Sequence, residues 1–136
     1  MNSYSHPVLV LALRRLLFAA VLFAAFAAPV AWAQAPAEME ATLKQMLAAT
    51  ENRRLDLFVA KGDASFRADI TPAMFNSYST QVGPRLKQGY TATFLSTLRQ
   101  EGYVVYVWKL EFKDGGDDML FSLAMKDGKV GGFFLR

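Results

Sequence analysis

The stretch of sequence that decides the fold is Tyr103-Val104-Val105-Tyr106-Val107-Trp108-Lys109-Leu110-Glu111-Phe112. Its side chains alternate in character with the period of a β-strand whose two faces meet different surroundings. One face is wholly apolar and aromatic, formed by Val104, Tyr106, Trp108, Leu110 and Phe112. The other face begins apolar at Tyr103, Val105 and Val107 and ends charged at Lys109 and Glu111. We therefore expect a strand whose aromatic face covers a core.

Similar alternating segments stand on both sides of this strand, and turn residues separate them. We expect strands at about 90–99, 103–112, 119–126 and 129–135. Glu101-Gly102 turns the first pair and Asp127-Gly128 turns the last, and a loop over 114–117 joins the middle two. Two-residue turns that accept positive φ angles suit the twist of a hairpin. The sequence therefore predicts a four-stranded antiparallel meander.

A helical pattern precedes the sheet. Apolar residues from Met39 to Val59 recur at helical spacing, which predicts a long helix over 38–60. Gly62 would stop this helix, because glycine accepts the left-handed conformation that ends many helices. Residues 63–70 are expected to be irregular or to form a single short turn.

A second helix is expected to begin at Thr71-Pro72. Threonine can cap the free amides of a helix, and proline at the first helical position loses no hydrogen bond. Gly83-Pro84 should kink or end this helix, because proline lacks the N–H donor that the helix requires.

The first 33 residues differ in character from the rest. Arg14 and Arg15 precede an apolar run over 16–28, and small residues flank a cut after Ala33, which is typical of a secretory signal peptide. The apolar run is shorter than the roughly 20 residues needed to cross a bilayer. We expect a signal peptide over 1–33, cleavage between Ala33 and Gln34, and a periplasmic or secreted protein without membrane contact. A flexible N-terminus over 34–37 and one domain over 38–136 would remain.

The residues after this cut contain neither histidine nor cysteine, because the only histidine is His6. This composition excludes a histidine-based triad, a cysteine nucleophile and the usual zinc or haem ligands. Asp114, Asp117 and Asp118 lack the further spaced ligands of a calcium loop and are interpreted as part of a hairpin turn. We therefore expect no cofactor and no metal.

Net charge gives little indication of a partner. The whole chain has 15 basic and 12 acidic residues, and loss of Arg14 and Arg15 leaves 13 against 12, a net charge of +1. The remaining basic residues are spread along the chain, whereas a nucleic-acid-binding protein needs a clustered basic face. No nucleic acid is expected as a partner.

Helices followed by such a sheet favour an α+β fold in which the sheet curls around the helices. Four stretches carry a resemblance to a known group: Leu55-Asp56-Leu57-Phe58-Val59-Ala60-Lys61-Gly62-Asp63, Pro84-Arg85-Leu86-Lys87-Gln88-Gly89-Tyr90, Trp108-Lys109-Leu110-Glu111-Phe112 and Gly128-Lys129-Val130-Gly131-Gly132-Phe133. Over most of 51–135 the chain resembles small secreted bacterial proteins of the nuclear transport factor 2-like (cystatin-like) superfamily. The resemblance implies N-terminal helices packed on a curved four-stranded antiparallel sheet. No extra hairpin separates the helices, so a reduced cystatin-like cone with a smaller pocket is expected.

Five residues are candidates for function in such a cone. The resemblance implies that Asp56 could act as a general base if desolvation raised its pKa, as in isomerases of the superfamily. The alternative is a solvated helix residue or a partner for the loop over 62–71. Tyr90 and Tyr106 could donate hydrogen bonds to a ligand, or they could be core aromatics. Trp108 could stack on a ring-shaped ligand or fill the core, and Arg85 could anchor an anionic group or pair with a carboxylate.

Three classes of function remain open, because the superfamily hosts enzymes, binding modules and dimerisation domains. The first is a non-catalytic domain that binds a small apolar ligand or a protein partner through its cone or sheet. The second is a homodimer that pairs through the outer sheet face, centred on Tyr103, Val105 and Val107. The third is an isomerase- or dehydratase-type enzyme that uses Asp56 with a tyrosine. The lack of a catalytic constellation favours the first class.

Overall fold

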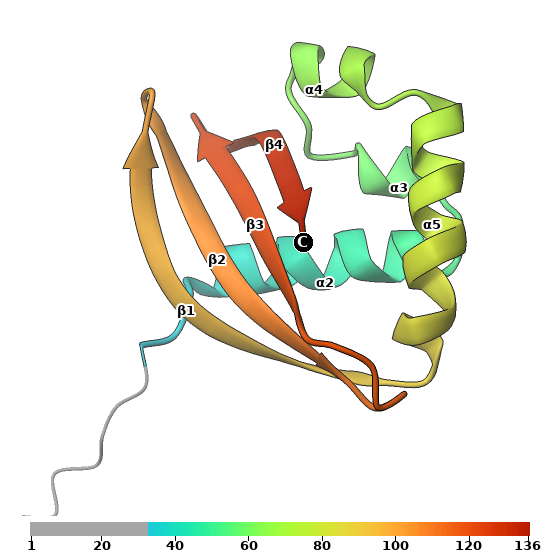
Figure 1. The fold of residues 1–136 in the computed structure, drawn as a ribbon. Coiled ribbons are helices and arrows are strands. Elements are labelled where there is room, and N and C mark those ends of the chain that lie inside the picture. Colours follow the sequence, from blue (N-terminus) through green and yellow to red (C-terminus); the bar gives the residue numbers. More distant parts are fainter. Residues whose placement is uncertain (1–32) are drawn as a thin grey trace, which may run out of the picture. The chain divides into compact units, whose positions relative to one another are not determined.

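The computed structural model describes residues 33–136, and the signal peptide expected over 1–33 lies outside them except for Ala33. Within this range four helices precede four strands (Figure 1). The helices are α2 (Ala37–Glu51), α3 (Leu55–Phe58), α4 (Ala64–Asp69) and α5 (Pro72–Lys87). The strands are β1 (Tyr90–Gln100), β2 (Tyr103–Phe112), β3 (Met119–Lys126) and β4 (Lys129–Leu135). None of the helices in this range is long and apolar enough to cross a membrane.

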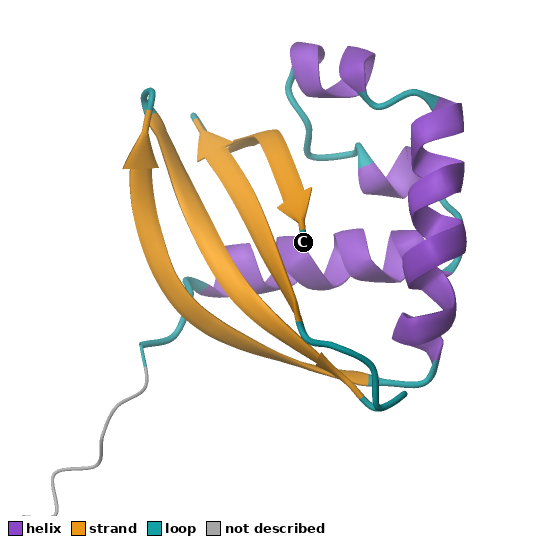
Figure 2. Ribbon diagram, in the orientation of Figure 1, coloured by secondary structure: helices purple, strands orange, loops and turns teal. Residues whose placement is uncertain are grey.

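The four strands form one antiparallel sheet in the order β1-β2-β3-β4, so the predicted meander is confirmed. The sheet curves, and the helices gather on its concave side (Figure 2). Helix α2 contacts both α3 and α5, and α4 contacts β4. The predicted fold class, an α+β domain with N-terminal helices packed on a curved four-stranded sheet, is confirmed.

The core lies between α2 and the concave face of the sheet. Trp108 has no exposed surface, and its indole Nε1–H donates a hydrogen bond of 2.9 Å to Glu40 Oε1 in the first turn of α2. Phe121 and Leu123 of β3 are equally buried beside it. A second aromatic group, centred on Phe58, joins the helices to β4: the Phe58 and Phe133 ring centroids lie 5.0 Å apart. One continuous apolar core therefore extends from the sheet to the helices.

The helix predicted over 38–60 is wrong in one respect, because it ends at Glu51 and a short helix restarts at Leu55. Arg53 adopts a left-handed φ of 53°. The Arg53 N–H then donates to the Thr50 carbonyl at 3.3 Å, and the Arg54 N–H donates to the Ala49 carbonyl at 2.8 Å. This pair of bonds is the usual way to satisfy the last carbonyls of a helix, normally with glycine at the left-handed position. An arginine there leaves no signal in the sequence.

Gly62 does not end a helix as expected, since α3 already ends at Phe58. Its backbone forms an isolated bridge with Val130 of β4. A Cβ atom at Gly62 would lie 2.5 Å from Cδ1 of Phe66. Close packing, not a left-handed turn, therefore requires the glycine.

Residues expected to be irregular over 63–70 contain a capped helix, α4. The Asp63 carboxylate accepts a hydrogen bond of 2.8 Å from the Phe66 N–H, so a short polar side chain supplies the missing helical acceptor. At the other end of the helical region, residues 33–36 have no regular secondary structure, although Ala35 is only 7% exposed.

Helix α5 begins at the predicted cap, where the Met74 N–H donates to Thr71 Oγ1 at 3.2 Å. It does not end at Pro84 but continues to Lys87. Leu86 in this last turn is buried, and packing of this kind offsets the one hydrogen bond that proline removes. The helix stops before Gly89, which has a φ of 101°.

We predict that Arg53→Gly stabilises the protein. Relief of left-handed strain of roughly 1–2 kcal/mol exceeds the entropy cost of glycine, roughly 0.5–1 kcal/mol, so the free energy of unfolding should rise by about 0.5–1 kcal/mol. Lys44→Gly, at an exposed position inside α2, is the matched control and should lower it by about 1 kcal/mol. Urea unfolding of both variants tests the assignment, and a loss of stability in Arg53→Gly would contradict it.

We also predict that Trp108→Ala lowers the free energy of unfolding by about 3–5 kcal/mol, because a fully buried ring leaves a cavity. Trp108→Phe keeps most of the volume but loses the hydrogen bond to Glu40, and should cost less. Thermal unfolding of both proteins provides the comparison. A cost below about 1 kcal/mol for the alanine variant would be incompatible with a buried ring.

Candidate functional site

The interior of the cone is occupied by the core. Trp108 is enclosed and its only polar atom is engaged by Glu40, so its ring is not available to stack on a ligand. Tyr106 packs on Trp108 with ring centroids 6.2 Å apart. Tyr90 is half-buried at the opposite end of the same face, and burial together with the charge of Glu51 raises the pKa of its hydroxyl. These residues lie where core aromatics are expected.

Asp56 lies on the surface of α3. Its two carboxylate oxygens accept hydrogen bonds of 2.9 and 2.7 Å from Nε and Nη2 of Arg54. These hydrogen bonds lower the pKa of Asp56, which is the opposite of what a general base near neutral pH requires. Its position agrees with a solvated helix residue.

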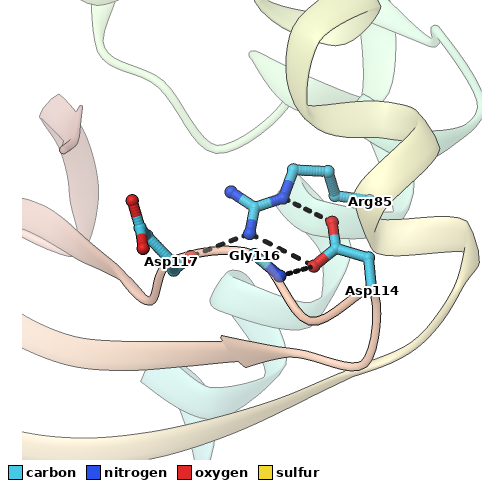
Figure 3. A network of polar contacts seen from close by, with 4 residues as sticks. All are labelled: Arg85, Asp114, Gly116 and Asp117. Atoms are coloured by element: carbon cyan, nitrogen blue, oxygen red, sulfur yellow. Dashed lines mark hydrogen bonds and ion pairs between the residues drawn. The ribbon is translucent and has the colours of Figure 1, made fainter.

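Arg85 pairs with a carboxylate (Figure 3). Its Nε donates to Asp114 Oδ2 at 2.7 Å, and its Nη2 donates to the Asp117 carbonyl at 2.7 Å. The guanidinium carbon also lies 3.9 Å from the centroid of the Phe112 ring. Asp114 accepts a further hydrogen bond of 2.9 Å from the Gly116 N–H. This network ties the last turn of α5 to the loop between β2 and β3. Among residues 33–136, no group of three or more acidic or histidine side chains could hold a metal ion.

A groove of about 630 Å³ lies on the face of the sheet that points away from the helices. Its lining consists mainly of the outward-facing residues of all four strands, and we call it the outer groove. The residues that line it include Leu98, Val105, Val107, Leu120, Ser122, Ala124, Gly132 and Phe134.

A β-bulge in β1 turns Leu98 toward the outer groove. Phe94 pairs with Trp108 on the inner face, whereas Ser96 pairs with Val107 on the outer face, so Leu95 is the extra residue. The bulge reverses the alternation for the rest of the strand. Leu98 consequently lies opposite Val105 on the outside.

Small residues form the floor of the outer groove over β3 and β4. Ala124 pairs with Gly132 there, and Ser122 stands beside them. Tyr103 closes one end, because its ring lies over Gly131 so closely that a Cβ atom at Gly131 would overlap it. Lys126 Nζ lies 5.6 Å from the centroid of the same ring.

The large apolar side chains of the outer groove are unusually exposed. Phe134 is 64% exposed, Leu98 53% and Leu120 48%. Single exposed apolar residues are common, but several gathered on one face indicate an interaction surface. The sequence placed Tyr103, Val105 and Val107 on this face, and all three line the groove. Leu98 and Phe134 were not predicted on this face; the bulge that places Leu98 there has no local sequence signal.

No protein-family model matches the sequence, and no curated protein matches it. Three solved structures are similar to this chain. An uncharacterized cystatin fold protein from Novosphingobium aromaticivorans is 17% identical, with 75% of this chain and 99% of that chain covered and a TM-score of 0.39. TerC, co-crystallized with polyporic acid, is 15% identical, with 73% and 89% covered and a TM-score of 0.41. An NTF2-like protein of unknown function from Cytophaga hutchinsonii is 6% identical, with 76% and 91% covered and a TM-score of 0.37.

The fold and the outer groove together define a small α+β domain with an apolar outer face. Two of the three similar structures are described as a cystatin fold protein and an NTF2-like protein. Likeness at these identities and TM-scores gives no evidence of a ligand or an activity for this chain.

We predict that Asp114→Asn destabilises the protein at neutral pH, and that this effect disappears in acid. The hydrogen bonds from Arg85 and then Gly116 lower the pKa of Asp114 below its usual value of 3.8. The charged carboxylate of Asp114 therefore stabilises the fold fully at pH values above its usual pKa of 3.8. This stabilisation is lost as the pH falls through the lowered pKa. Urea unfolding of the wild type and the variant across the acid range measures the difference. Asp117→Asn is the control, because Asp117 accepts a hydrogen bond from Arg85 at its backbone carbonyl and its carboxylate only adds a charge nearby. An equal pH dependence in both variants would contradict the assignment.

Proposed function

We propose that this domain is a non-catalytic binding module that acts through the outer groove of its sheet. The observation that carries the proposal is the gathering of three exposed apolar side chains, Leu98, Leu120 and Phe134, around a floor of small residues. Leaving such a surface in water is unfavourable, so a partner that covers it gains free energy from burial.

A protein partner suits the outer groove better than a small ligand. Pockets for small molecules enclose most of the ligand surface. Here the walls are side chains that remain about half exposed, and the floor is an open sheet. A broad complementary surface would contact the whole groove, whereas a small apolar molecule would keep one side in water.

The remaining candidate residues support a non-catalytic role. Asp56 is exposed and carries a lowered pKa, and Arg85 is engaged by Asp114. The residues after Ala33 include neither histidine nor cysteine. We further propose that the protein is exported to the periplasm or secreted, since the residues before Gln34 have the pattern of a cleaved signal peptide.

We predict that partners are lost when the outer groove is made polar. The test is native mass spectrometry of the protein purified gently from its own host, as the wild type and as Phe134→Ser. The wild type should carry a second copy, another protein or a smaller molecule, and Phe134→Ser should carry markedly less of it. The polypeptide mass in the same spectra shows whether the chain begins at Gln34.

Met74→Ser is the matched control, because Met74 is 56% exposed on α5, outside the groove. It removes a similar amount of exposed apolar surface and should retain the bound species. A wild type that carries nothing, or a bound species that persists equally in Phe134→Ser, would contradict the proposed function.

A further inference from the structure

We infer that the unpaired edge of β1, at its hairpin end, binds an extended segment of another polypeptide as a fifth strand of the sheet. The segment runs antiparallel to β1 along residues 96–100 and places an acidic side chain beside Arg99. This inference goes beyond the proposed function and does not rest on it, because it concerns the backbone edge of the sheet and not the outer groove.

The two edges of the sheet differ in how far this chain covers them. At the start of β4, the Asp63 N–H donates to the Val130 carbonyl at 2.8 Å, and the Val130 N–H donates to the Lys61 carbonyl at 2.9 Å. The loop before α4 therefore pairs with that edge. Strand β1 forms the opposite border of the sheet (Figure 1), and no backbone hydrogen bond among residues 33–136 reaches its far side. An unpaired edge of this kind accepts a further strand.

The hairpin turn fixes the hydrogen-bond pattern at the end of β1. Its two residues, Glu101 and Gly102, have φ angles of 52° and 81°, and a type I′ turn requires positive values at both positions. The residues that flank such a two-residue turn, Gln100 and Tyr103, form a hydrogen-bonded pair. Hydrogen-bonded and non-hydrogen-bonded pairs then alternate along the antiparallel ladder.

This alternation shows which backbone groups of β1 are left unpaired. Leu98 and Ser96 belong to hydrogen-bonded pairs with β2, so the N–H and C=O groups of Thr97 and Arg99 point away from β2. The Thr97 carbonyl instead accepts a hydrogen bond of 3.3 Å from the hydroxyl of its neighbour Ser96. The edge thus presents donors and acceptors at alternate residues, which is the spacing that an extended backbone matches.

The hairpin end of this edge is accessible from both faces of the sheet. All residues from Leu95 to Gln100 are exposed, including Thr97 and Arg99, whose side chains face the concave side. The helices therefore do not cover the sheet there. The bulge at Leu95 interrupts the regular ladder, so an added strand follows residues 96–100 and ends at the bulge.

The charge of β1 specifies the chemistry of the added strand. Arg99 is the only charged residue of β1, and it forms no ion pair within residues 33–136. Opposite charges directly across a strand pair stabilise it, and like charges destabilise it. An acidic side chain is therefore favoured opposite Arg99. A second copy of β1 does not supply one, because β1 contains neither aspartate nor glutamate.

The neighbouring positions favour an apolar residue and a β-branched residue. Leu98 is 53% exposed on the outer face, so an apolar side chain opposite it buries apolar surface. Thr97 faces the concave side, where a β-branched side chain suits a cross-strand pair. Antiparallel pairing is the more stable of the two directions per residue. Read from its N-terminus, the added segment is thus acidic, apolar and β-branched opposite Arg99, Leu98 and Thr97.

The test titrates a synthetic peptide of sequence TVELTVT, blocked at both ends, into isotope-labelled protein and follows the amide signals by NMR. The glutamate of the peptide lies opposite Arg99, and its leucine lies opposite Leu98. We expect saturable shifts that are largest for the amides of residues 96–100. The control peptide TVKLTVT carries lysine in place of glutamate, and its dissociation constant should be higher by at least about twofold.

Two changes test the backbone pairing itself. A TVELTVT peptide that is N-methylated at the threonine opposite Thr97 lacks the N–H that donates to the Thr97 carbonyl, and it should not bind detectably. Thr97→Pro removes the corresponding donor of the protein and spares the ladder with β2, since proline is tolerated where the N–H faces solvent at a sheet edge. It should weaken binding of the unmodified peptide. Thermal unfolding monitors the fold of this variant, and the N-methylated peptide makes the same test on the unchanged protein.

Reversal of the charge tests the role of Arg99. In Arg99→Glu the preference should be exchanged, so that TVKLTVT binds more tightly than TVELTVT. Arg99→Gln is the matched control and should bind the two peptides about equally. A preference for TVELTVT that persists in Arg99→Glu would overturn the assignment of Arg99.

The outcomes also separate this inference from the proposed function. Phe134→Ser changes the outer groove and should leave peptide binding at the β1 edge unchanged. Loss of peptide binding in Phe134→Ser, with shifts in the wild type confined to groove residues such as Val107 and Ser122, would place the peptide in the outer groove. That result overturns the inference and leaves the proposed function intact.

Three other results would also overturn the inference. The first is that no peptide binds, and the second is that the N-methylated peptide binds as tightly as the unmodified one. The third is self-association of the wild type that Thr97→Pro abolishes, because the β1 edge would then be occupied by a second copy of this chain. None of these results bears on the outer groove.

Discussion

The hydrogen bond between the Trp108 indole and the Glu40 carboxylate determines how the helices lie on the sheet. A buried N–H without a partner is costly, and the first turn of α2 supplies the acceptor from 68 residues away. Once this contact is made, the apolar side of α2, with Leu43 and Met46, covers the inner face of β2 and β3. Helices α3 and α5 in turn pack on α2.

Filling the concave side in this way decides which surface is left for function. The largest aromatic residue of the sheet, the one most suited to stacking, is used to hold the fold together. The polar candidates for catalysis or binding are likewise engaged: Arg85 hydrogen-bonds Asp114 in the β2–β3 loop, and Asp56 hydrogen-bonds Arg54. What remains is the convex side, where the chain keeps Phe134 and Leu98 in water. In the proposed function, stability and recognition depend on opposite faces of one sheet.

Local sequence signals were sufficient for the strands and insufficient for the helices. Alternation and turn residues located all four strands within one residue of their observed bounds, because each signal is short-range. The break at Arg53 was missed because an arginine occupies the left-handed position where glycine is usual. The continuation of α5 past Pro84 was missed because it depends on the burial of Leu86. The same holds for the site. The alternation of β2 predicted Val105 and Val107 on the outer face. The Leu95 bulge, which brings Leu98 beside them, has no local sequence signal.

The bulge at Leu95 has a consequence for how this strand can change length. Phe94 faces the interior and Leu98 the exterior, although Leu98 lies four positions further along the strand, a spacing that would put both on one face of a regular strand. Without Leu95, Phe94 would still pair with Trp108 and Ser96 with Val107, so Leu98 would stay on the exterior and Arg99 on the interior of a regular ladder. The bulge is therefore the place where β1 can lose a residue without exchanging its two faces, whereas a deletion further along the strand could be absorbed there only by moving Ser96 to the interior and Thr97 to the exterior.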